Sequence, residues 1–168
     1  IANILNYLHL FFSSFSLLVY QTKGCTGDYE MSISVGINGF GRIGRSTFSH
    51  IAESARNDIH VTKINATGPI ETNAHLLKYD SVHGRFSGEI TVENDHLDIG
   101  NGPVKVFSSY DPNDLDWSGC DVVLECTGKF NDGIKSKVHI QQGAKSVLIS
   151  APADNVDKTI VYELITDH

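Results

Sequence analysis

The chain has 168 residues, of which 40% are hydrophobic, and it carries a formal net charge of −7. That length supports one domain with a hydrophobic core of its own. The acidic balance, without a run of basic residues, argues against non-specific nucleic-acid binding, and three cysteines without a Cys-x-x-Cys pair favour a reducing compartment.

The first 22 residues contain no Lys, Arg, Asp or Glu and are long enough to cross a bilayer. Polar residues interrupt this stretch, no basic segment precedes it, and Lys23 lies close before Cys25, which argues against a signal or lipoprotein segment. The single methionine, Met31, directly precedes the first expected strand. We therefore expect residues 1–30 to be upstream sequence outside the domain; a membrane or signal segment is the alternative.

A strand, a glycine-rich turn and a helix are expected in succession from residue 33. Apolar residues alternate over 33–37, the segment 39–44 fits the spacing G-x-G-x-x-G, and an apolar period of 3.6 follows to residue 55. This order predicts a dinucleotide-binding βαβ unit, in which the glycines permit the turn and the helix N–H groups meet the phosphates. The residues that this interpretation assigns to the diphosphate are Asn38, Gly39, Phe40, Gly41, Arg42, Ile43 and Gly44.

The glycine turn has two other interpretations. A protein-kinase loop needs a valine two residues after the last glycine and a lysine on a following strand, whereas Ser46 and a helix follow here. A glycine-rich turn without a ligand remains open as the structural alternative.

The second expected strand, residues 60–65, ends where NAD-binding domains place a carboxylate for the adenosine ribose hydroxyls. This chain has Asn65, Ala66 and Thr67 there, so the carboxylate is missing. Thr67 can donate a hydrogen bond to a 2′-phosphate, and Lys63 adds positive charge nearby. We therefore expect dual or NADP-leaning specificity; the alternative is that backbone contacts keep NAD binding adequate.

A short helix over 71–79 is predicted next, with Ala74, Leu76 and Leu77 facing inward, followed by a loop over 79–86. His83 in that loop has no paired carboxylate or nucleophile, so we expect a structural role for it.

Residues 88–107 alternate between polar and apolar and contain two turns, which predicts an antiparallel meander inserted into the βαβ pattern. Trp117 is expected to be buried in the turn that follows.

The last third of the domain returns to the strand–helix–strand pattern. The apolar run 121–126 predicts a buried parallel strand. Asp132 is expected to cap a helix over 132–142, in which Ile134, Val138 and His139 share a face and which ends at Gly143. Buried residues 146–150 and residues 159–162 predict two more strands. The sequence thus predicts a Rossmann-type doubly wound α/β sheet with an inserted meander, spanning residues 31–162.

Five separated strings resemble glyceraldehyde-3-phosphate dehydrogenases in the family's order. They are INGFGRIGR (37–45), HLLKYDSVHGRF (75–86), DVVLECTGKF (121–130), GAKSVLISAP (143–152) and TIVY (159–162). The resemblance runs from about Met31 to Tyr162 and is to the NAD(P)-binding domain. Erythrose-4-phosphate dehydrogenase, a relative with similar motifs, is the alternative.

The resemblance implies NAD or NADP as cofactor and extends the site along the carboxyl ends of the strands. Tyr110 stands where the family commonly has an arginine, and it can stack on adenine or be a plain surface residue. The further residues implied to line the cofactor are Asn65, Ala66, Thr67, Tyr110, Cys126, Thr127, Gly128, Phe130, Ser150 and Ala151.

The family's glycolytic reaction is the phosphorylating oxidation of glyceraldehyde 3-phosphate, in which a Cys attacks the aldehyde, a His takes the proton and hydride passes to the nicotinamide. The family's Ser-Cys-Thr-Thr-Asn-Cys motif does not occur here, and no His is arranged with Cys126. We therefore expect no catalytic residue, no metal site and no dehydrogenase activity from this chain alone, with residues 163–168 an aberrant tail.

The expected partners follow from the same resemblance. They are the dinucleotide for this chain, and a small phosphorylated aldehyde and a homotetramer for the full-length cytoplasmic enzyme, with no nucleic acid and no membrane. A stand-alone dinucleotide-binding module without turnover is the alternative.

Overall fold

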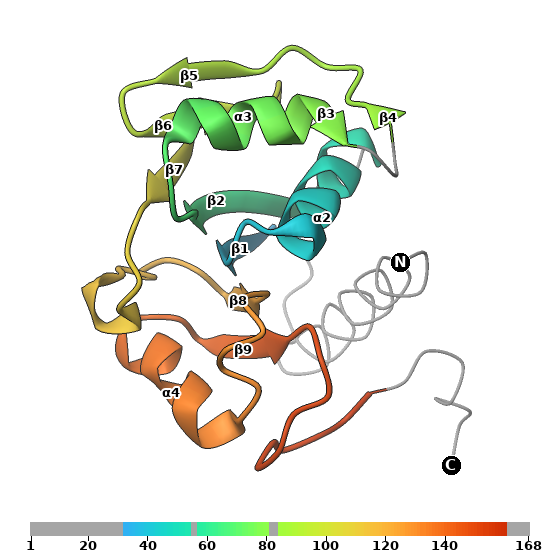
Figure 1. Ribbon diagram of the computed structural model, residues 1–168. Helices are drawn as coiled ribbons and strands as arrows, with labels where there is room; N and C mark the ends of the chain where they lie inside the picture. Colours follow the sequence, from blue (N-terminus) through green and yellow to red (C-terminus); the bar gives the residue numbers. More distant parts are fainter. Residues whose placement is uncertain (1–31, 55–56, 81–83, 161–168) are drawn as a thin grey trace, which may run out of the picture.

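A computed structural model describes residues 32–54, 57–80 and 84–160 (Figure 1). The predictions for residues 1–30, for His83 and for the tail 163–168 therefore lie outside the described residues. The described chain forms a seven-stranded sheet in the order β5-β6-β7-β2-β1-β8-β9 and a separate two-stranded sheet of β3 and β4.

The elements follow the predicted alternation closely. The strands of the main sheet are β1 (Ile33–Asn38), β2 (Ile59–Asn65), β5 (Thr91–Glu93), β6 (His96–Asp98), β7 (Val104–Phe107), β8 (Val122–Glu125) and β9 (Ser146–Ile149). The helices are α2 (Arg42–Glu53), α3 (Ile70–Lys78) and α4 (Gly133–Gln141), with a 3₁₀ turn η1 (Pro112–Asp114).

The sheet is parallel through its centre and antiparallel at one end. β1 pairs in parallel with β2 and β8, β2 pairs in parallel with β7, and β8 pairs in parallel with β9. β5, β6 and β7 form the antiparallel meander, so β7 joins the two parts. The predicted doubly wound sheet with an inserted meander is confirmed.

The two faces of the sheet carry separate hydrophobic clusters. The connections β1–α2–β2 and β8–α4–β9 step in opposite directions, so right-handed crossovers place α2 and α4 on opposite faces. Along β8, Val122 and Leu124 belong to one cluster with Phe48 of α2, whereas Val123 belongs to the other with Trp117. The strand is buried on both faces, as its continuous apolar run predicts.

Three details of the α2–α3 side differ from the sequence prediction. Leu77 is buried and Ala74 packs against the core, but Leu76 is 41% exposed and the polar Asn73 is buried in its place. Asn73 is tolerated inside because its Nδ2 donates to the carbonyl of Pro69, 3.1 Å away. The expected loop over 79–86 contains β3 (Tyr79–Asp80) paired with β4 (Gly84–Arg85).

The α4 side shows both a confirmed cap and an error in the expected helix face. The Asp132 side chain accepts hydrogen bonds from the N–H groups of Ile134 and Lys135, as an N-cap does. His139 is fully buried, but Ile134 is 64% exposed, so the two do not share one environment.

Beyond α4 the predicted strands fit less well. β9 is only half-buried because it is the outer strand of the described sheet. Thr159 and Ile160 lie outside any strand, and the remaining two residues of that prediction fall outside the described chain.

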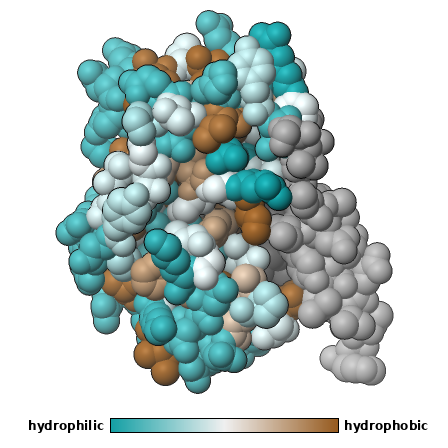
Figure 2. All heavy atoms as spheres, viewed as in Figure 1, coloured by the Kyte–Doolittle hydropathy of each residue, from teal (hydrophilic) through white to brown (hydrophobic). Residues whose placement is uncertain are grey.

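The surface in view is mainly hydrophilic, with hydrophobic residues in small separate groups (Figure 2). Among the residues that the structure describes, no helix has both the length and the apolar character needed to cross a bilayer.

Candidate functional site

The carboxyl ends of the parallel strands form a single row across the sheet. The register aligns Phe107, Asn65, Asn38, Glu125 and Ile149, which are the last residues of β7, β2, β1, β8 and β9. In open α/β sheets, ligands bind just beyond this edge, where neighbouring crossovers diverge. Here β1 and β8 flank that point. The predicted site residues lie at the ends of these strands, in the loops that follow them, or, for Arg42, Ile43 and Gly44, in the first turn of α2.

The glycine turn after β1 is packed tightly against the loop after β8. Gly39 has a positive φ of 96°, and a Cβ at that position would lie 2.7 Å from the backbone nitrogen of Thr127. A Cβ on Gly44 would overlap the carbonyl oxygen of Gly39 and lie 3.2 Å from Cγ2 of Ile37. These two glycines therefore allow the turn and the close seating of α2 on β1.

The N-terminus of α2 has the features of an anion site. Gly41 is its N-cap residue, no side chain caps it, and its first turn contains no acidic residue. The first N–H groups of a helix have no intrahelical partner and lie at the positive end of its dipole. By contrast, Asp132 already occupies the equivalent groups of α4.

Space is available at the same place. A Cβ on Gly41 would meet no atom within 4 Å, although the neighbouring Gly39 and Gly44 are tightly packed. An open position beside uncapped helix N–H groups fits a diphosphate that approaches the backbone closely. The residues of this turn therefore fit a dinucleotide.

The end of β2 places its three predicted residues differently. Ala66 is buried and its N–H donates to the carbonyl of Phe107, 2.9 Å away, while Thr67 is exposed at the edge. Asn65 turns inward: its Nδ2 donates to the carbonyl of Ser109 at 3.0 Å, and its Oδ1 accepts from the N–H of Ser109 at 3.1 Å. The Asn65 side chain therefore holds the loop after β7.

Lys63 does not supply the charge that the sequence suggested near Thr67. Its Nζ donates to the carbonyls of Asp116 and Ser118, each 2.9 Å away, and to the carboxylate of Asp116 at 3.0 Å. The ammonium group is therefore committed to these partners. A different cation, Lys129, lies near Tyr110, with its Nζ 5.6 Å from the centre of the Tyr110 ring, which is 80% exposed.

The loop after β8 carries a partly buried thiol that packs against the hydrophobic core. Burial raises the pKa of Cys126 to about 12. A thiol with that pKa is almost entirely protonated at neutral pH and is a poor nucleophile. The structure thus agrees with the interpretation of Cys126 as a packed thiol.

The remaining predicted residues divide between the edge and the interior. Ser150 and Ala151 follow β9 directly, and the N–H of Ser150 donates to the carbonyl of Glu125, 3.0 Å away. Phe130 packs edge-on against His139, with ring centres 6.1 Å apart. The Phe130 ring therefore packs against α4.

A buried carboxylate that the sequence pattern did not predict as a site residue lies at the centre of this edge. Glu125 is 1% exposed, and its two oxygens accept hydrogen bonds from Asn38, Thr127 and His139. Burial raises the pKa of this carboxyl, but the hydrogen bonds that it accepts outweigh burial and hold the pKa below its ordinary value of 4.5. The sequence signal that could have indicated it is a glutamate at the end of an apolar strand, because a buried acid requires hydrogen-bond or ionic partners.

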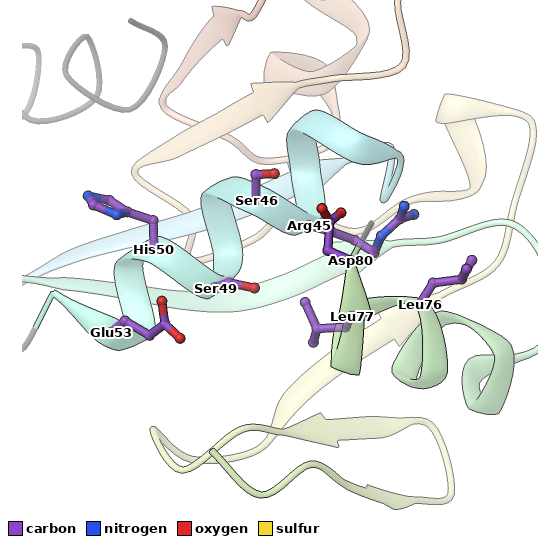
Figure 3. A pocket seen from close by; sticks show the side chains of 8 residues that line it. All are labelled: Arg45, Ser46, Ser49, His50, Glu53, Leu76, Leu77 and Asp80. Atoms are coloured by element: carbon purple, nitrogen blue, oxygen red, sulfur yellow. The ribbon is translucent and has the colours of Figure 1, made fainter. Parts of the chain in front are cut away.

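The pocket in Figure 3 is distinct from this edge. It lies between α2 and α3, with a volume of about 100 Å³, far below the roughly 300–1,000 Å³ of typical ligand sites. One link joins it to the glycine turn: Nη1 of Arg45, which lines the pocket, donates to the carbonyl of Phe40 at 2.9 Å. The pocket is too small for a dinucleotide.

Comparison with known proteins finds relatives over most of this chain. A family model described as "Glyceraldehyde 3-phosphate dehydrogenase, NAD binding domain" matches residues 33–133. Glyceraldehyde-3-phosphate dehydrogenase of Cereibacter sphaeroides is 54% identical over 132 residues, which is 79% of this chain and 40% of that protein. The enzyme of the same name from Xanthobacter flavus is 54% identical over 134 residues, with the same coverage. The chain therefore spans about two fifths of the length of these curated relatives.

Proposed function

The chain belongs to the glyceraldehyde-3-phosphate dehydrogenase family, and we propose that it provides the part of such an enzyme that holds NAD or NADP. The observation that carries this proposal is the uncapped N-terminus of α2 beside the open space at Gly41, at the point where the crossovers diverge. The proposed domain spans residues 31–162.

The proposed contacts follow the row of strand ends. N–H groups of the turn 39–44 would bind the diphosphate, Thr67 and Tyr110 would face the adenosine half, and the segments after β8 and β9 would flank the rest of the cofactor. The bound dinucleotide would supply the hydride acceptor. The chain's own residues bind and orient it, and the reactive Cys motif of the family is not among the 168 residues.

The wider proposal concerns the enzyme to which such a domain contributes. We place it in the phosphorylating oxidation of glyceraldehyde 3-phosphate, in a cytoplasmic homotetramer, because the relatives named above are glyceraldehyde-3-phosphate dehydrogenases. We expect this chain alone to bind the dinucleotide without turning over the aldehyde.

Gly41→Val tests the proposed diphosphate site. Gly41 has an ordinary φ of −74° and an open Cβ position, so we expect only the cost of replacing glycine at a helix N-cap, about 1 kcal/mol of unfolding free energy. The added side chain would fill the space of the diphosphate, and we expect the dissociation constant for the dinucleotide to rise at least about tenfold, or about 1.4 kcal/mol. Calorimetric titration and urea unfolding measure the two quantities.

Thr91→Val on β5, at the far end of the sheet, is the matched control and should leave the dissociation constant unchanged. Saturable binding of equal strength in wild type and Gly41→Val would contradict the assignment of this turn. A folded wild type that binds neither NAD nor NADP at millimolar concentration would contradict the proposed function itself.

The missing carboxylate at Ala66 predicts tolerance of a 2′-phosphate. A carboxylate at this position would accept from the 2′-hydroxyl and repel the phosphate, and neither effect is present here. We expect dual or NADP-leaning specificity, so NAD should bind no more than about tenfold more tightly than NADP, a difference of about 1.4 kcal/mol. Titration with both compounds decides this, and Ala66→Asp should shift the preference toward NAD. NAD binding more than about tenfold tighter in the wild type would rule it out.

A further inference from the structure

The buried carboxylate of Glu125 is not among the proposed cofactor contacts, but it is the centre of a hydrogen-bond network that includes two of them, Asn38 and Thr127. Oε2 accepts from Nδ2 of Asn38 at 2.6 Å and from Nε2 of His139 at 3.0 Å. Oε1 accepts from the backbone N–H of Thr127 at 2.8 Å and from its hydroxyl. Both oxygens thus serve as acceptors for groups from β1, α4 and the loop after β8.

Trp117 and Asn65, which bond to His139 and Asn38, determine which atoms of the network donate and which accept. The indole Nε1 of Trp117 is a donor only, and it lies 3.1 Å from Nδ1 of His139, so Nδ1 accepts and Nε2 carries the proton. On the other side, Oδ1 of Asn38 accepts from Nδ2 of Asn65 at 2.8 Å, so Nδ2 of Asn38 faces Glu125. The group at position 125 therefore meets donors only, which an ionised carboxylate satisfies and an amide does not.

The same network shapes the two loops that line the site. The hydroxyl of Thr127 also accepts from the N–H of Lys129 at 3.1 Å, across Gly128, whose φ is 72°. The backbone of Thr127 in turn forms the wall against which Gly39 is packed. Through Thr127 and Asn38, Glu125 thus fixes the turn after β8 and the residue before the glycine turn after β1.

We propose that Glu125 is the positioning residue of the dinucleotide site, acting through Thr127 and Asn38 without touching the cofactor. This inference rests on the proposed function for the identity of the ligand. In structural terms, the Glu125 carboxylate holds the glycine turn after β1 and the turn after β8 in the conformation that binding requires.

Glu125→Gln tests the inference with almost no change in size. The Gln oxygen can still accept from Thr127, but its NH₂ group then faces the donors of Asn38 and His139. Turning the Asn38 amide would relieve one clash and break its bond from Asn65, and changing the His139 tautomer would set its proton against Trp117. No arrangement satisfies every group, so the loops should loosen.

Two measurements on the 168-residue chain separate a positioning role from a general loss of stability. In Glu125→Gln, we expect amide hydrogen exchange to rise at least tenfold at Thr127 and Lys129, but not at Val123 in the middle of β8. We expect the NAD dissociation constant, measured where the variant is fully folded, to rise at least tenfold. Glu93→Gln removes an exposed carboxylate on β5 and should change neither quantity.

A second substitution provides the rescue. Asn38→Asp in the Glu125→Gln background places an acceptor opposite the new NH₂ group, keeps the bond from Asn65 and conserves the charge of the pair. The donor of His139 still faces the NH₂ group, so the rescue is partial. We expect the double variant to recover slow exchange at Thr127 and Lys129 and at least half of the lost binding free energy. If position 125 needed a carboxylate for a reason unrelated to Asn38, the double variant would show no such recovery.

Unchanged exchange at Thr127 and Lys129 in folded Glu125→Gln would overturn the inference. If the wild type binds NAD, an equal NAD dissociation constant in Glu125→Gln would also overturn it. Uniformly faster exchange throughout the sheet would also overturn it, because that result describes global destabilisation. A wild type that binds no dinucleotide would refute the proposed function, whereas the exchange comparison would still decide whether Glu125 holds the loops.

Discussion

Gly44→Ala is expected to lower the unfolding free energy by about 3 kcal/mol and to abolish measurable dinucleotide binding. The added methyl group would overlap the carbonyl oxygen of Gly39, which is backbone and cannot rotate away, and would lie 3.2 Å from Ile37. To make room, α2 has to move off β1, which displaces its N-terminal N–H groups. Urea unfolding followed by circular dichroism, together with calorimetric titration, measures the two losses.

This expectation has the opposite sign to helix propensity, which favours alanine over glycine inside a helix by about 1 kcal/mol. The test is therefore sharp: a stabilised Gly44→Ala would show that α2 does not pack on the turn as described. Ser49→Ala, a half-buried position on the same helix, is the control and should change the unfolding free energy by no more than about 0.5 kcal/mol.

Trp117→Ala should destabilise the chain even more, by about 3–5 kcal/mol. The indole is completely buried, packs edge-on against Phe107 with ring centres 6.0 Å apart, and lies over Gly36 of β1, where no side chain competes for the space. Removing it leaves a large cavity in the smaller of the two hydrophobic clusters and deprives Nδ1 of His139 of its donor. Urea unfolding measures the loss.

Trp117→Phe separates the two contributions, because it keeps most of the ring but removes the indole N–H. We expect this variant to lose about 1–3 kcal/mol, the range for an unsatisfied buried polar group. If Trp117→Ala and Trp117→Phe were equally stable, packing of the indole would contribute little. If both matched the wild type, the description of this cluster would be wrong.

Periodicity and glycine spacing were enough to predict the mixed sheet, and they supplied the proposal for where the site lies. Alternating and continuous apolar runs marked the strands, and Asp132 and Gly143 marked the ends of α4, because these signals act within a few residues of the chain. The carboxyl-edge rule then placed the candidate residues without any knowledge of their contacts.

Both errors concern which side of an element faces the interior or a distant partner, and this depends on tertiary packing. Leu76 was assigned to the core by spacing alone, but the position toward the interior belongs to Asn73, which satisfies its amide on the preceding turn. Lys63 was expected near the cofactor because of its position in the chain, whereas Asp116 and Ser118, more than fifty residues away, hold its ammonium group. No local pattern reports such partners.

The network around Glu125 illustrates the same limit at the site itself. Glu125 and His139 look like ordinary polar residues of a strand end and a helix, and only the register of β1 and β8 with α4 brings them together. A strand that is apolar up to a terminal glutamate indicates that the acid is buried. It does not identify the hydrogen-bond donors that compensate the free-energy cost of burying the charge.

The left-handed backbone at Gly39, which packs tightly against Thr127, affects the free energy of ligand binding. The loop is held in this shape by contacts within the protein, so its loss of conformational entropy belongs to folding rather than to association. A ligand that meets a preorganised cradle spends less of its interaction energy on ordering the receptor. Complex formation should then proceed with little rearrangement of the main chain at this turn.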